Sequence, residues 1–82
     1  MDAKTARELS MKVRFHSVEV KIANSDENIR EAAEKGRLSL LYSFDYDVSA
    51  QYAYDKLKKK HPDFSVKRYE SHEFAHAIVI SW

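Results

Sequence analysis

The chain has 82 residues, and its 14 lysines and arginines nearly balance its 13 aspartates and glutamates, giving a formal net charge of +1 at pH 7. This balance provides no general attraction to nucleic acid or to an anionic membrane. The absence of cysteine excludes disulfides, iron–sulfur clusters and thiolate zinc sites. The apolar runs are all shorter than the ~20 residues that a membrane-spanning helix needs. We therefore expect one small soluble domain over residues 1–82.

Apolar residues recur at helical spacing in the first third of the chain. This stripe consists of Met11, Phe15, Val18, Ile22 and Ile29. Its steps of three, four and seven predict a helix from about residue 3 to about residue 35. A strand over residues 12–22 is the alternative, because Val18 and Val20 also alternate with polar residues, and Asn24-Ser25-Asp26 would then cap a shorter helix. We favour the helix, which Gly36 ends as a C′ glycine.

Beyond Gly36 the pattern changes to short apolar segments around one further helix. The expected elements are a buried strand over 38–44, a helix from Asp47 or Ser49 to about Lys60, a short strand over 64–68 and a last strand over 74–82. Pro62 stops the helix, and β-branched and aromatic residues favour the strands. The order α-β-α-β-β predicts an α+β fold in which two helices pack on one face of a small three-stranded sheet.

The segment His72-Glu73-Phe74-Ala75-His76 matches H-E-x-x-H. In zinc metalloproteases this spacing places two histidines on one metal, with the glutamate as general base. In the predicted last strand, however, His72 and His76 would lie roughly 13 Å apart, too far to share an ion. No third ligand follows, so we interpret the match as a coincidence. We predict no catalytic, cofactor-binding or metal-binding residue, and no cofactor.

Three short patterns resemble a known group of proteins. They are Met1-x-Ala3-x-x-Ala6-Arg7, Ile29-x-x-Ala32-Ala33-x-x-Gly36 and the closing Ile80-Ser81-Trp82. Together they resemble a loose group of short proteins encoded by tailed bacteriophages, although that group often has L-G-Y-x-V where residues 61–66 read H-P-D-F-S-V. The resemblance implies a viral accessory protein in the cytoplasm of an infected bacterium or in the virion. It supplies no catalytic residue, and it favours the helical interpretation of the N-terminal region.

Basic and aromatic residues are the candidates for binding a partner. The predicted partner-binding residues are Tyr42, Tyr46, Tyr52, Lys56, Lys59, Lys60, Lys67 and Arg68. Tyrosines bring a large apolar area and a polar tip to an interface. The basic residues could bind phosphate, but lysines near a helix end also interact favourably with its dipole and keep a surface solvated. We favour the solvated face, and therefore predict no specific binding to nucleic acid. Asp45 and Asp47 are interpreted as a cap and a loop rather than as cation ligands.

Without a catalytic constellation, the sequence predicts that the protein is not an enzyme and binds a host protein, a phage protein or a small ligand stoichiometrically. The alternatives are a virion component in a repeating assembly and, more remotely, a minimal zinc hydrolase using residues 72–76. The stripe from Met11 to Ile29 is longer than strands that rise ~3.3 Å per residue. We therefore predict a homo-oligomer formed through the N-terminal helix, which Phe15→Asp should weaken.

Overall fold

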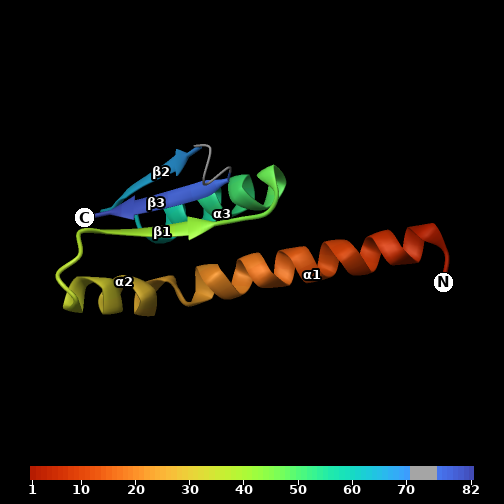
Figure 1. Cartoon of the computed structure of the whole chain (residues 1–82), viewed down its shortest axis with the longest axis horizontal. Helices are drawn as coiled ribbons and strands as arrows, with labels where there is room; N and C mark the ends of the chain where they lie inside the picture. Colours follow the sequence, from red (N-terminus) through yellow and green to blue (C-terminus); the bar gives the residue numbers. More distant parts are fainter. Residues whose placement is uncertain (71–75) are drawn as a thin grey trace.

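Figure 1 shows the computed structural model of the chain, which describes residues 1–70 and 76–82. The elements in chain order are α1 (Ala3–Ala23), α2 (Ser25–Glu34), β1 (Ser39–Ser43), α3 (Asp47–Lys60), β2 (Ser65–Tyr69) and β3 (Ala77–Ser81). The fold is α+β, as predicted, but the described residues contain three helices where the sequence indicated two. Within the described residues, no helix has both the length and the apolar character needed to cross a bilayer.

The sheet is antiparallel, with the strand order β1-β3-β2. The central strand is β3, in which Ile80 pairs with Leu40 on one side and with Val66 on the other. Ile78 and Ile80 are completely buried, because a central β-branched strand with alternate residues facing the core can bury that whole face. Since β1 and β2 are both antiparallel to β3, they run in the same direction, and α3 connects them.

The core forms between α3 and the buried side chains of the sheet. On α3, the spacing of Ala50, Ala53 and Leu57 creates one apolar face whose members are at most 1% exposed. Small alanine side chains let the helix approach the strands closely, and Leu57 fills the remaining space. The buried cluster comprises Val18, Tyr42, Phe44, Ala50, Ala53, Leu57, Val66, Ile78 and Ile80.

The N-terminal region is helical, which excludes the strand over residues 12–22. The predicted single helix is nevertheless interrupted at Asn24, whose N–H donates to the Val20 carbonyl over 3.0 Å. Ser25 then begins α2, and its buried hydroxyl donates to the Ile22 carbonyl over 2.7 Å. The break therefore lies in Asn24-Ser25-Asp26, the segment expected to cap a shorter helix if residues 12–22 formed a strand. The chain is helical on both sides of this break, as the favoured interpretation predicted.

The predicted apolar stripe is mostly used by the domain itself. Val18 is buried, and Ile22 and Ile29 pack against the core. Phe15 lies edge-on to Tyr52, with their ring centroids 5.5 Å apart. Met11 is the stripe residue that stays more than a third exposed, at 37%. The stripe is therefore used by the domain from Val18 onward, where α2 continues along β1, and the predicted homo-oligomer through the N-terminal helix stays a prediction.

The N-terminal half of α1 is exposed along its length, although Met11 and Val13 line shallow surfaces shared with residues 44–49. The molecule measures 49 × 27 × 21 Å, and Figure 1 shows the N-terminal end of α1 passing beyond the sheet and α3. Residues 1–13 are all exposed. We call residues 3–13 the arm. Its first turn is capped by Asp2, whose Oδ1 accepts from the Thr5 N–H over 2.8 Å, and this bond lowers the pKa of Asp2.

The end of α2 follows the prediction from Gly36. This glycine has φ +79°, the left-handed conformation that side chains disfavour. The Arg37 N–H donates to the Ala32 carbonyl and the Gly36 N–H to the Ala33 carbonyl, over 3.0 and 2.9 Å. These two bonds form a Schellman motif, which satisfies carbonyls that the helix itself leaves free.

Replacing Gly36 by alanine should lower the free energy of unfolding by about 1 kcal/mol. A Cβ at this position would meet no atom within 4 Å, so the cost comes from the backbone conformation alone. Urea denaturation measures the change. The matched control is Lys35→Ala, at a residue with an ordinary φ of −87°, which should shift stability by less than about 0.5 kcal/mol. Equal midpoints for Gly36→Ala and the wild type would contradict this account.

Candidate functional site

The first candidate site lies where α3 begins and the β2–β3 connection starts and ends. Asp47 is the first residue of α3, Glu70 follows β2, and His76 precedes β3. The ligand atoms of these three residues lie within 4.8 Å of one another. Carboxylate oxygens and an imidazole nitrogen can bind zinc and related divalent metals. Whether these three residues can bind a cation depends on which other groups already contact their ligand atoms.

Arg68 places a positive charge in this group. Its Nη2 lies 2.7 Å from Asp47 Oδ1 and 3.5 Å from Glu70 Oε1, and its Nη1 donates to Gln51 Oε1 over 2.9 Å. The hydrogen bond from Arg68 lowers the pKa of Asp47 and so favours its ionised form. A cation would have to displace a charge-assisted hydrogen bond already made by a guanidinium. The group therefore works as an ionic link between α3 and β2.

Two sequence interpretations concern this region. Asp47 does not cap α3, because Tyr46 occupies the N-cap position and makes no side-chain capping bond. His76 is the one residue of the 72–76 segment that lies within the described structure, and its carbonyl accepts from the Phe44 N–H over 2.9 Å. Residues 71–75 lie outside the described residues, and with them the predicted separation of His72 from His76 and the predicted start of the last strand at Phe74.

The second candidate contains the residue types of a hydrolytic triad. Ser25 Oγ lies 2.8 Å from His61 Nε2, and His61 Nδ1 lies 3.6 Å from Asp26 Oδ1. In a hydrolase the histidine accepts the serine proton. Here the Ser25 hydroxyl donates to the Ile22 carbonyl, so the hydrogen-bond network assigns the imidazole proton to Nε2, which donates to Ser25. Ser25 is 0% exposed and His61 4%, and no substrate can reach the hydroxyl.

Lys60 reinforces the same junction between helices. Its Nζ donates to the Ile22 carbonyl over 2.8 Å and lies 3.5 Å from Asp26 Oδ2. Ile22 belongs to the last turn of α1, where a positive charge satisfies free carbonyls and complements the helix dipole. The structure thus gives Lys60, a predicted partner-binding residue, a role inside the fold. It also explains why α1 stops where the C-terminal end of α3 meets it.

The predicted tyrosines occupy different environments. Tyr42 is 8% exposed, and its hydroxyl accepts from Asn28 Nδ2 over 2.7 Å; burial raises its pKa. This corrects its placement on a partner-binding surface. Tyr52 donates to Glu19 Oε1 over 3.1 Å, which links α3 to α1. Tyr46 is 43% exposed, with the Arg14 guanidinium 3.7 Å from its ring centroid.

The predicted basic residues are not brought to one site. Arg68 and Lys60 interact with carboxylates of the domain, as described above. Lys56 lies on α3 with its Nζ 5.6 Å from the Tyr52 ring centroid, and Lys59 is exposed on the same helix. Lys67 is exposed on β2 and alternates with Val66, which is buried. Its side chain therefore lies on the sheet face opposite that of Val66.

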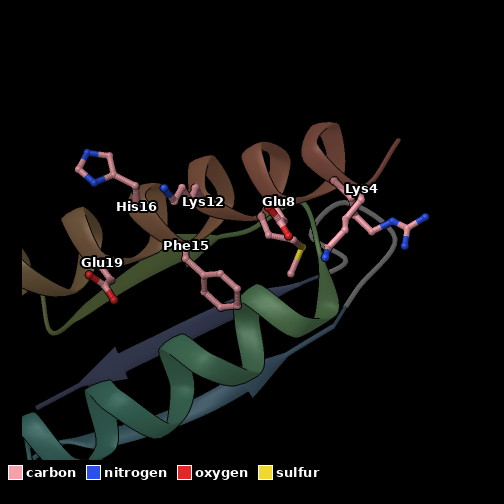
Figure 2. A pocket seen from close by; sticks show the side chains of 8 residues that line it. Lys4, Glu8, Lys12, Phe15, His16 and Glu19 are labelled. Carbon is pink, nitrogen blue, oxygen red and sulfur yellow. The ribbon is translucent and has the colours of Figure 1, made fainter. Parts of the chain in front are cut away.

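A groove along α1 was missed by the sequence reasoning. Its lining residues are Lys4, Arg7, Glu8, Met11, Lys12, Phe15, His16 and Glu19. In Figure 2, Phe15 points toward α3, and the other labelled side chains extend from the same stretch of α1. The groove is open and combines an apolar centre with charged edges. The i, i+4 spacing of Met11 and Phe15 does place both side chains on one face of the helix. The sequence analysis interpreted that face as a surface for self-association.

Comparison with known proteins adds no assignment. No protein-family model, curated protein or solved structure matches the chain.

We expect the purified protein to carry no stoichiometric zinc, because Arg68 occupies the carboxylates that an ion would need. Elemental analysis after gel filtration measures the metal content. In Arg68→Met the competing charge is gone, and zinc affinity measured by calorimetry should rise at least about tenfold. One zinc per wild-type chain, lost in His76→Ala, would contradict the prediction.

Stability should fall as the pH drops below about 6.5. Burial lowers the pKa of His61 from its usual 6.5, against an opposing effect of Asp26. Between the two pKa values the unfolded chain binds more protons than the folded protein, so the free energy of unfolding decreases with decreasing pH. Urea denaturation at pH values of about 7.5 and 5.5 measures the difference. His61→Gln should reduce this dependence, and an identical dependence in both proteins would rule out His61 as its source.

Proposed function

We propose that the chain is a non-enzymatic binding protein that acts by occupying a partner protein, and that the arm is its contact element. The observation that carries the proposal is the exposure of every residue from 1 to 13 in a segment that is helical from residue 3. A helical segment of this length gains little stability in water without a packed face. The domain core does not use it, so a contact outside the domain gives the arm its role.

The polar groups support binding over catalysis. The hydroxyl of Ser25 is sealed and already donates a hydrogen bond, which removes the nucleophile that a serine hydrolase would need. Arg68 holds the carboxylate of Asp47, which argues against a metal at the Asp47, Glu70 and His76 group. Both groups are accounted for by their roles in joining helices to one another and to the sheet.

The groove suggests the chemistry of the partner. Met11 and Phe15 form its apolar centre, and Lys4 and Arg7 lie toward the free end of the arm. A partner segment with one apolar side chain between Met11 and Phe15, followed by acidic side chains beside the two basic ones, would match this arrangement. We propose a host or phage protein as the source of that segment, in the infected cell or in the virion.

The packing of the helices on the sheet leaves the arm exposed to solvent. We propose that the helices share one face of the sheet, because Val18 of α1, Leu57 of α3 and Ile80 of β3 belong to one buried cluster. In that arrangement α1 is held along its C-terminal half, and the arm continues in the same direction past the end of the domain.

Immobilised wild-type protein should retain one protein from an extract of phage-infected bacteria, and Met11→Asp should lose it. With that protein purified, calorimetry should show affinity at least about tenfold weaker for Met11→Asp and for Arg7→Glu. The matched control is Leu38→Asp, at a residue that is 72% exposed before β1. Equal affinities of Met11→Asp and Leu38→Asp for the same protein would show that the arm is not the contact element.

A further inference from the structure

We propose that two copies of the chain pair through the outward face of α1 as a short antiparallel coiled coil. The inference rests on the proposed function in treating α1 as a contact element, but it centres on Leu9 and Val13 instead of Met11 and Phe15. Lys12, His16 and Glu19 border both surfaces. A second copy of the chain is the occupant to which the proposal commits.

The outward face of α1 has a heptad pattern. Its members are Ala6, Leu9, Val13, His16, Val20 and Ala23. We call these six residues the seam. Their steps alternate between three and four, which is the a/d spacing of a coiled coil. They lie roughly half a turn of the helix from Val18, the residue of α1 that enters the core.

The seam is exposed within the described structure, although Leu9 and Val13 also line a shallow surface beside Tyr46. All six of its residues are exposed, and Val13 is 70% exposed despite being apolar. Figure 2 shows His16 pointing away from α3, whereas Phe15 points toward it. A heptad pattern on the solvent side of a helix does not contribute to the packing of its own domain. A second helix packed against it would bury these apolar side chains.

Charged residues beside the seam select the antiparallel orientation. When Leu9 faces Val20 of a second copy, and Val13 faces its His16, Lys12 lies beside Glu19 of that copy. Two-fold symmetry repeats this ion pair. In a parallel pair, Lys12 would instead face a serine, and the two His16 side chains would meet inside the seam. The antiparallel arrangement is therefore the one with complementary charges.

The opposite flank of the seam and the position of the domains fit the same arrangement. Ser10 and Ser17 flank the seam on its other side, and such small side chains allow close approach of two helices. Each domain is attached along the C-terminal half of α1 (Figure 1), so antiparallel pairing places the two domains at opposite ends of the helix pair. The seam spans about 27 Å, but only Leu9, Val13 and Val20 are large and apolar. We expect a reversible dimer with micromolar affinity.

Sedimentation velocity from about 5 to about 500 μM should show a monomer–dimer equilibrium. Val13→Asp should weaken it at least about tenfold, because a carboxylate would be buried in the seam. Met11→Asp, on the groove face, should leave it unchanged. His16→Leu should strengthen it at least about tenfold by removing the polar seam residue, an effect that misfolding cannot imitate. A monomer at every concentration, or equal weakening by Met11→Asp, would overturn the pairing.

A charge exchange tests the orientation. Lys12→Glu and Glu19→Lys should each weaken the dimer about 3- to 10-fold by replacing attraction with repulsion. Because Glu19 also accepts from Tyr52 of its own domain, Tyr52→Phe, which removes that bond alone, is the control and should leave the dimer unchanged. The double variant should restore most of the wild-type affinity. Persistent weakness of the double variant, with circular dichroism showing an intact fold, would overturn the proposed alignment.

Disulfide trapping gives a second measure of orientation, because the chain has no cysteine. A mixture of Leu9→Cys and Val20→Cys proteins should cross-link between unlike chains. Cross-linking of Leu9→Cys with itself would overturn the antiparallel order. The two proposals are separable: Val13→Asp should be monomeric yet retain the partner protein, and Met11→Asp should dimerise yet lose it. If Val13→Asp still dimerised, the seam would not be the dimer interface. If Met11→Asp still bound the partner protein, the groove would not be the partner-binding site.

Discussion

The buried hydrogen bond between Ser25 and His61 fixes the direction in which α1 leaves the domain. Ser25 stands at the break between α1 and α2, and His61 follows the last residue of α3, so the bond joins segments 36 residues apart. Lys60 adds a hydrogen bond to the Ile22 carbonyl at the same point. The burial of Val18 and the packing of Phe15 on Tyr52 hold the rest of α1 against the domain. With these contacts, the arm projects past the sheet along one defined line.

Residue types that suggest catalysis serve here as structural links, and burial decides the difference. The serine, histidine and aspartate of the junction are placed around a hydroxyl that solvent cannot reach. Arg68, likewise, neutralises the carboxylates that could have bound a metal. A small domain buries a limited apolar area, and satisfied polar contacts between its elements add stability at a modest net gain for each. Both groups join α3 to another part of the fold.

The two ends of α1 obey different constraints. Toward α2, Val18 and Ile22 pack on the core, so that part of the helix gains stability from tertiary contacts. Toward the N-terminus, the groove and the seam begin on the exposed arm, and both continue past it to residues 15–23, where Phe15 and Glu19 contact Tyr52. The proposals assign one face to a partner protein and the other to a second copy, which would let a pair of chains present two grooves.

Local signals in the sequence determined most of the elements. Gly36 marks the end of α2 because only glycine readily adopts the conformation found there, and Pro62 follows α3 because it cannot continue a helix. The burial of Ala50, Ala53 and Leu57 also follows from their spacing. Contacts between distant residues decided the rest. Asn24 interrupts the helix where His61 and Lys60 meet the chain. Tyr42 is buried in the core cluster and accepts a hydrogen bond from Asn28, and Arg68 forms an ionic link between α3 and β2. The sequence contains both apolar faces of α1, but only the tertiary structure shows which one the core consumes, because that depends on where α3 and the sheet meet the helix.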